Sequence, residues 1–421
     1  MIYRNVSVWL RHPPVPGIQG FAVLAGLEAG MRGVLSSVWP LVLYHGLGSA
    51  SAVSLAYLLV GFVALGYGML VPGLGRLVPR RWLYTFGAIL YAIGPALGIM
   101  GGSTLAFFAM MVTALAGATV FICTNAYIMD YIARHDLGRN ETRKMVYSAI
   151  SWAAGPVLGV WMWKFWHPLP FLVAIGFAVA LLSTFWFLRL GNGKLISRAR
   201  APAPNPLAYL GRFFRQPRLI GGWLFATIRS FGWWVYIVYL PIFCIENGLG
   251  DQVGSFAYSA SNLMLLGSPF MLRWMQPRGL RFGVRFAFWA AAFFFLITSV
   301  AGYWPPLAVI GFFLGSIFLV MLDAFGSLPF LLAVRPAERT EMSAVYASYR
   351  DVSGILAPGA AWLVLLVMPI TGFFAVSAFG LFLTGMVAGR MHPKLGMKRS
   401  PVEPPEPANL PNPVSPTAAA R

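Results

Sequence analysis

The chain has 421 residues, of which 58% are hydrophobic and only 10% are charged. A typical soluble domain has about 25% charged residues, so this composition excludes a soluble enzyme, a disordered protein and a fibrous protein. Basic residues outnumber acidic residues by 31 to 12, which gives a net charge of +19. The position of these charges relative to the apolar segments decides what they mean.

Twelve apolar segments follow one another along the chain. Each is near the roughly 20 residues that a helix needs to cross a bilayer, and none alternates as a membrane β-strand does. The sequence therefore predicts an all-α polytopic membrane protein. Its twelve transmembrane helices are expected at residues 18–45, 52–75, 82–101, 104–133, 145–165, 169–190, 219–245, 253–275, 283–302, 306–334, 345–367 and 371–391.

The basic residues gather in alternate loops, and Lys164 is the one basic loop residue on the opposite side. Three further arginines, Arg32, Arg229 and Arg350, lie within predicted helices. Cytoplasmic loops carry an excess of Lys and Arg, so both termini are predicted to be cytoplasmic. The positive charge is thus an orientation signal and an attraction to anionic membrane lipid, and it does not indicate nucleic-acid binding. We expect a monomer in the bacterial inner (plasma) membrane.

The sequence offers no residues arranged for a metal or for catalysis. Cys123 and Cys244 fall in different helices without metal-ligand spacing, and the histidines lie at helix ends or in loops. Nucleophile, zinc and nucleotide-binding motifs are absent from the sequence. We therefore expect no cofactor, no metal and no enzymatic activity.

A basic, proline-rich segment, residues 191–218, interrupts the apolar pattern. It divides the chain into two predicted six-helix bundles, 18–190 and 219–392. Residues 1–17 form a cytoplasmic N-terminal segment in this division. The proline-rich tail, 393–421, has the composition of a disordered segment.

The two predicted bundles share a pattern at an offset of about 200 residues. Pro40 precedes Gly46-Leu47-Gly48, and Pro241 precedes Gly248-Leu249-Gly250. Tyr57 and Tyr258 follow at similar distances. These matches indicate an internal duplication, and parallel repeats of this kind build a midplane site between the halves of some transporters.

On these features the chain resembles the major facilitator superfamily over residues 18–392. The loop after the second predicted helix is similar to the family's G-x-L-x-D-R-x-G-R motif, with Gly68, Leu70, Gly75 and Arg76 matching. Pro72 and Gly73 stand where the family has Asp-Arg, which weakens the latch role that the resemblance implies for this loop. The resemblance also implies that the first and seventh helices line a central cavity.

In the fifth predicted helix, Gly155 and Pro156 lie in a segment similar to the Gly-Pro-rich motif of the family's exporters. This similarity favours export. Small residues also let helices pack closely, and packing alone is the other interpretation of the segment.

Charged residues near helix midpoints are candidate functional residues, because a charge at the membrane centre costs roughly 3 kcal/mol. Glu28 and Arg32 share a face of the first helix, and Arg229 occupies the position equivalent to Glu28 in the second half. We hypothesise that Glu28 and Arg229 pair across the cavity beside Arg32 and couple proton or substrate binding to conformational change. A static pair that only neutralises charge is the alternative. Trp233, one turn after Arg229, is expected to line the cavity.

Asp323 lies near the middle of the tenth predicted helix, and its repeat counterpart is Asn125. Burial disfavours the charged form of a carboxyl group, which suits a proton carrier. A hydrogen bond that only joins helices is the other interpretation.

Two charged pairs lie nearer the cytoplasmic ends. Asp130 is one turn before Arg134, where an interfacial salt bridge or a substitute latch is expected. Arg350 and Asp351 begin the eleventh helix and, with Arg339 and Glu341, could form a gate network.

The sequence therefore predicts a proton-coupled secondary transporter, more specifically an exporter of a small organic solute. The alternative is a non-transporting membrane assembly or carrier factor on the same fold, which the altered loop after the second helix favours. A membrane enzyme such as an acyltransferase is a third possibility, and the sequence lacks a polar constellation for it.

Overall fold

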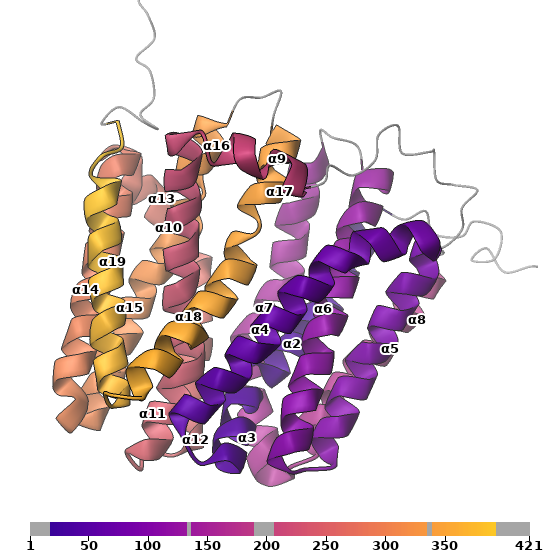
Figure 1. Ribbon diagram of the computed structural model, residues 1–421, viewed down its shortest axis with the longest axis horizontal. Coiled ribbons are helices and arrows are strands. Elements are labelled where there is room, and N and C mark those ends of the chain that lie inside the picture. Colours follow the sequence, from indigo (N-terminus) through magenta and orange to yellow (C-terminus); the bar gives the residue numbers. More distant parts are fainter. Residues whose placement is uncertain (1–16, 133–135, 189–205, 335–338, 393–421) are drawn as a thin grey trace, which may run out of the picture.

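The computed structural model describes residues 17–132, 136–188, 206–334 and 339–392, and the chain forms two helical bundles (Figure 1). The first bundle contains α2 (Ile18–Ser36), α3 (Val38–Leu47), α4 (Ala50–Leu77), α5 (Arg80–Ile99), α6 (Ser103–Tyr131), α7 (Leu137–Phe165) and α8 (Leu169–Phe187). The second contains α10 (Pro217–Trp234), η2 (Val235–Tyr239), α11 (Leu240–Glu246), α12 (Asp251–Leu263), η3 (Met264–Gly267), α13 (Ser268–Met275), α14 (Leu280–Val300), η4 (Ala301–Tyr303), α15 (Pro305–Phe325), α16 (Leu328–Ala333), α18 (Tyr349–Leu365) and α19 (Ile370–Ala388). The short helices α9 (Pro206–Phe213) and α17 (Arg339–Tyr346) pack on each other.

Ten helical segments of the described chain are long and apolar enough to cross a membrane. They confirm the polytopic all-α prediction and begin or end close to the predicted bounds. The other two predicted spans, 253–275 and 345–367, are interrupted or shorter. The first is broken at η3, just before Pro269, whose missing N–H cannot continue the helical hydrogen bonds. The second is reduced to α18, which α17 precedes as a separate helix.

Both bundles interrupt their first helix before the repeated proline. Pro40 cannot donate a hydrogen bond to Ser36, and the helix breaks at Ser37 between α2 and α3. In the second bundle the helix widens into the π-helix η2 immediately before Pro241. The same residue therefore produces a local break at equivalent positions of the two halves.

The helices alternate in direction between two ends of the molecule (Figure 1). We call the end with α9, α16 and α17 the linker end, because α8 finishes and α9 begins there. The opposite end, with α3, α11 and the start of α12, is the far end. At the far end Gly48 has a φ of 72°, a left-handed conformation that favours glycine and turns the chain from α3 into α4.

The two bundles contact each other along two helix pairs. α4 of the first bundle packs against α18 of the second, and α7 packs against α12. Gly61 of α4 lies against Gly354 of α18, where a Cβ added to Gly61 would be 3.1 Å from the Gly354 carbonyl oxygen. The absence of side chains lets these two backbones approach closely.

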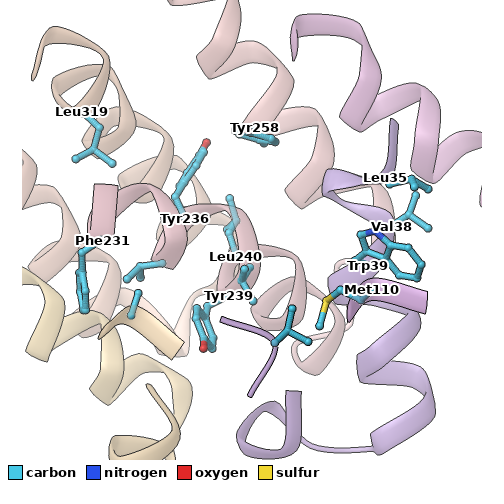
Figure 2. Close-up of a cluster of buried hydrophobic side chains, with 14 of the residues drawn as sticks. Leu35, Val38, Trp39, Met110, Phe231, Tyr236, Tyr239, Leu240, Tyr258 and Leu319 are labelled. Carbon is cyan, nitrogen blue, oxygen red and sulfur yellow. The ribbon is translucent and has the colours of Figure 1, made fainter. Parts of the chain in front are cut away.

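Buried apolar side chains continue from one bundle into the other toward the far end. Figure 2 shows this cluster, with Leu35, Val38 and Trp39 from the first half and Tyr239 and Leu240 from the second. Val38, Tyr239 and Leu240 are fully buried. The core thus joins the two halves at the far end.

Candidate functional site

Glu28 and Arg32 of α2 form a charged pair within the first bundle. Arg32 Nη1 lies 3.6 Å from Glu28 Oε1, and the Tyr91 hydroxyl donates a hydrogen bond of 3.2 Å to the same oxygen. The Glu28 side chain is 14% exposed, whereas that of Arg32 is 52% exposed. The guanidinium of Arg32 also lies over the ring of Trp152, 5.7 Å from its centroid. Arg32 is therefore the accessible member of the pair.

These residues line a pocket of about 130 Å³ in the first bundle. α2, α5, α6, α7 and α8 supply its wall, which combines two cations, one carboxylate and several hydroxyl, amide and aromatic groups. The polar and aromatic side chains of this wall are Glu28, Arg32, Tyr84, Phe121, Thr124, Asn125, Lys144, Ser148 and Trp152. Asn125 thus lines the same pocket as Glu28 and Arg32.

Arg229 and Asp323 form a second charged pair, within the second bundle. Arg229 Nε of α10 lies 2.9 Å from Asp323 Oδ1 of α15. Trp233 Nε1 donates a 2.7 Å hydrogen bond to Asp323 Oδ2, so both carboxylate oxygens are occupied. Arg229 Nη2 donates to the Tyr349 hydroxyl at 3.3 Å. The Arg229 side chain is 9% exposed and that of Asp323 is 29% exposed.

The predicted pair between Glu28 and Arg229 is wrong for this structure. Each residue has a partner in its own bundle, Arg32 for Glu28 and Asp323 for Arg229. Repeat equivalence places Glu28 and Arg229 at the same depth in the two halves, but it does not bring them together. Nearer partners satisfy both charges, because a buried charge needs a counter-charge at short range.

The two pairs nevertheless belong to one region between the bundles. Tyr258 of α12 is close enough to interact electrostatically with both Arg32 and Asp323. Arg350 of α18 lies over the ring of Phe121, a residue of the first bundle's pocket, at 5.6 Å. Tyr258 and Arg350 of the second bundle thus link its charged groups to Arg32 and Phe121 of the first.

At the far end, polar contacts join the two bundles. The Tyr44 hydroxyl donates to Glu246 Oε1 at 3.2 Å, and His45 Nε2 lies 3.6 Å from Asp251 Oδ1. Deeper in the interface, the buried Tyr239 hydroxyl donates to Ser54 Oγ at 2.8 Å. These contacts hold the two bundles together at the far end.

Toward the linker end, the facing helices expose apolar side chains. Ile150 of α7 is 76% exposed, and Phe270 of α13 is 76% exposed. Further toward the far end the same pair of helices is in contact, where the Val157 backbone N–H donates to Ser259 Oγ at 3.2 Å. The interface between α7 and the α12–α13 helix is therefore tighter toward the far end.

Asp130 forms a salt bridge with Arg80 of α5, whose guanidinium also lies over the Tyr127 ring. α5 and α6 pack side by side at the linker end, so this cation comes from the neighbouring helix. Arg134, the partner expected from the sequence, lies outside the described residues, and its pairing with Asp130 stays a prediction.

The predicted latch residues Gly68, Gly75 and Arg76 all lie inside α4, which continues to Leu77. A Cβ added at Gly68 would meet nothing within 4 Å, and one at Gly75 only Leu83 of the same bundle. This segment, expected as a loop, is thus a helix end whose two glycines lack close contacts with the second bundle.

Gly155 lies at the contact between α7 and α2. A Cβ on Gly155 would be 2.5 Å from the Gly33 carbonyl carbon, and one on Gly159 would overlap the Val34 carbonyl oxygen. Pro156 lies inside α7, next to Val157, which contacts Ser259 of the second bundle. The glycines therefore serve close helix packing, the second interpretation of this motif.

Arg350 and Asp351 begin α18 and are both exposed. Arg350 Nε donates to the Tyr349 hydroxyl at 3.2 Å, which links it to the Arg229 cluster. Arg339 and Glu341 belong to α17, and the expected gate network with them stays a prediction because their side chains lie outside the described part of the chain. The position of Arg350 over Phe121 makes it a contact between the halves.

The described residues contain no group of three or more His, Cys, Asp or Glu side chains that could hold a metal ion. Cys123 and Cys244 are both buried and free. The arrangement present consists of two charge pairs, each with an aromatic ring beside its arginine.

Sequence reasoning missed the aromatic partners of the charged residues, namely Tyr91, Trp152 and Tyr349. Each lies within a predicted helix, where a polar aromatic group needs a partner. That requirement could have marked Tyr91 and Trp152 as candidates. Which helix faces which is information that the sequence of one chain does not contain.

Comparison with known proteins agrees with this architecture. The profile of the Major Facilitator Superfamily matches residues 21–358, and no curated protein matches the chain in sequence. The solved structure of the peptide transporter POT in complex with sulfate is similar with a TM-score of 0.70 and 13% identity, over 91% of this chain and 97% of that chain. The nucleoside transporter NupG is similar with a TM-score of 0.65 and 14% identity, over 89% and 99% of the two chains. At such identity the likeness shows a common fold.

Proposed function

The chain belongs to the Major Facilitator Superfamily, and we propose that it is a proton-coupled secondary active transporter that exports a small organic solute. We place it as a monomer in the bacterial inner membrane, with the linker end in the cytoplasm. The observation that carries the proposal is the presence of one charge pair in each bundle, Glu28–Arg32 beside the pocket of the first bundle and Arg229–Asp323 in the second.

Alternating access requires the two bundles to separate at one end and close at the other. Each bundle neutralises its own central charges, so the bundles can move apart at mid-depth without separating a buried ion pair. The contacts that hold the far end, including Tyr239 to Ser54, are hydrogen bonds of modest net strength, about 1 kcal/mol each. We interpret this structure as a state that is closed at the far end.

Proton coupling needs a carboxylate whose protonation changes what its partner can bind. Asp323 holds both Arg229 and Trp233 through different oxygens. A proton on Asp323 weakens its hold on Arg229, and the released guanidinium can then bind a solute group. In the first bundle, a proton on Glu28 would release Arg32 in the same way.

The solute class follows from the groups that remain accessible. Arg32 and Arg350 each lie over an aromatic ring that borders the cavity, Trp152 and Phe121 respectively. Planar or aromatic solutes can stack on such surfaces. Export is the direction favoured by the similarity of the segment around Gly155 and Pro156 to the family's exporters.

A thermal-shift screen tests solute binding first. The panel contains aromatic acids, drugs, nucleosides, dipeptides, sugars and amphiphiles, each at pH 6 and pH 8. A ligand at 100 times its Kd stabilises a protein by about 2.7 kcal/mol. Each stabilising solute is then added to proteoliposomes that contain the protein and a pH-sensitive dye in the lumen.

We expect a solute that stabilises the protein to move protons across the vesicle membrane, and Glu28→Gln or Asp323→Asn to abolish this movement. Glu141→Gln, which removes an exposed carboxylate, is the matched control and should keep it. Solute uptake without proton movement would contradict the proposed proton coupling and leave only uncoupled transport. Solute binding without any transport would favour the assembly or carrier factor.

A further inference from the structure

The linker end of α13, α14 and α19 carries an uncompensated group of arginines. Between Asp251 and Asp323 the sequence contains no acidic residue, and none follows Asp351 until Glu403. The basic residues at this end of the three helices are Arg273, Arg278, Arg281, Arg285 and Arg390. Neutralisation of this group therefore has to come mainly from outside these helices.

Arg285 is set into the groove between α14 and α19. Its guanidinium lies over the ring of Trp289, 3.9 Å from the centroid. Gly385 of α19 makes the space for the ring, since a Cβ there would be 2.4 Å from Trp289 Nε1. Gly389, the C-cap of α19, lies beside Arg285. The groove is therefore formed by backbone and held by aromatic stacking.

Two polar atoms in this groove have no hydrogen-bond partner. Arg285 Nε and Trp289 Nε1 are both buried and unpaired. Leaving a buried donor unsatisfied costs about 1–3 kcal/mol, and more when the group is charged. Native structures retain such donors where a ligand, ion or water supplies the acceptor.

Arg281 adds a second positive charge on the same face of α14. It lies one turn before Arg285, and like charges at this spacing repel on a helix. No salt bridge to either arginine occurs among the described residues. An anion between the two guanidinium groups would turn this repulsion into two favourable contacts.

The surface below the arginines is apolar and exposed. Phe382 stacks on Trp289 at 6.0 Å and is 45% exposed, and Met386 is 46% exposed. From the linker end inward, the groove thus presents first Arg285, then Trp289 and then the apolar side chain of Phe382. In Figure 1, α14 and α19 lie together at the side of the second bundle that is away from the first.

We propose that the groove between α14 and α19 binds an anionic phospholipid. The phosphate lies between Arg281 and Arg285, where its oxygens accept from the guanidinium groups, and one acyl chain runs along Phe382 and Met386. Basic pockets between membrane helices on the cytoplasmic side are suited to anionic headgroups. This site is separate from the pocket beside Glu28 and Arg32, and its occupation does not depend on the proposed transport.

Native mass spectrometry of the full-length protein tests the site. The protein is titrated with phosphatidylglycerol or with phosphatidylcholine of the same acyl chains, and melting temperatures are measured in parallel. We expect preferential retention of phosphatidylglycerol and a rise in melting temperature. In Arg281→Gln/Arg285→Gln the affinity for phosphatidylglycerol should fall about thirtyfold. Each arginine near an anionic lipid contributes roughly 1 kcal/mol, and the variant removes two of them.

The control variant is Arg215→Gln/Arg218→Gln, which removes two exposed arginines from the same end of the second bundle. It should bind phosphatidylglycerol like the wild type. Equal weakening in both variants would reduce the effect to general surface charge and overturn the proposal, as would equal retention of both lipids by the wild type. Inorganic phosphate at the same concentration should not raise the melting temperature, and an equal rise would identify an anion site without lipid specificity.

Discussion

Arg229 forms an ion pair with Asp323 of its own bundle, with Nε and Oδ1 2.9 Å apart. The position equivalent to Arg229 in the first bundle is Glu28, which forms an ion pair with Arg32. The two residues at equivalent positions carry opposite charges and have separate partners. Each half of the protein is electrically balanced at its centre, and this balance leads to the first prediction.

Arg229→Gln should destabilise the protein by about 3 kcal/mol, because it leaves the Asp323 carboxylate without its cation. Asp323→Asn in the same chain should recover most of this loss. Glu28→Gln and Arg229→Gln should instead be additive within about 0.5 kcal/mol, as expected for independent sites. Thermal unfolding of the single and double variants in detergent measures both couplings. Strong coupling between positions 28 and 229 would contradict the separate pairs.

The hydroxyl of Tyr239 should control how readily the far end opens. Tyr239→Phe removes the hydrogen bond to Ser54 of the other bundle, and Tyr236→Phe removes one to Ser261 of the same bundle. Each change should cost about 1 kcal/mol of folding stability. Only Tyr239→Phe should increase the far-end distance between spin labels at positions 47 and 249, measured in a Cys123→Ala/Cys244→Ala background. An equal increase in Tyr236→Phe would show that general loosening is responsible.

The contact between His45 and Asp251 should help to hold the far end closed. His45 Nε2 of the first bundle lies 3.6 Å from Asp251 Oδ1 of the second. His45→Gln weakens this contact, because glutamine cannot carry the positive charge of a protonated imidazole. We therefore expect the distance between the same spin labels to increase in this variant.

His167→Gln should leave this distance unchanged. His167 is the matched control because it is a nearby histidine that also contacts Trp163, edge-on where His45 stacks face to face. The idea fails if both variants change the distance equally.

Gly159→Ala should disrupt the packing of α7 on α2. The new Cβ would overlap the carbonyl oxygen of Val34, which is backbone and cannot rotate away. Overpacking of this kind costs about 1–3 kcal/mol, and we expect a lower melting temperature and a lower yield of folded protein. Gly176→Ala on α8 is the control, since a Cβ there meets nothing within 4 Å. A similar loss in both variants would point to a general effect of alanine.

The helices of this fold were predictable because the bilayer constrains them. A span has to contain about 20 apolar residues, so Pro305–Phe325 begins within one residue of its predicted start. Breaks inside a span were harder to foresee, and η3 is an example. There a local proline effect competes with a hydrophobic pattern that continues through it.

Charged residues could be identified from the sequence, but their partners could not. Spacing along one helix places Glu28 and Arg32 on the same face, and they form an ion pair. It gave no indication of the contact between Asp130 and Arg80, which lies on α5. The order in which helices surround one another decides such contacts, and a helix-by-helix reading carries no information about it.

The contact between Gly61 and Gly354 has a mechanical consequence. α4 is 28 residues long, and Gly61 divides it unequally, into arms of about 17 Å toward Ala50 and about 24 Å toward Leu77 at 1.5 Å per residue. For a given rotation of α4 about this crossing, the Leu77 end of the helix therefore moves further than the Ala50 end.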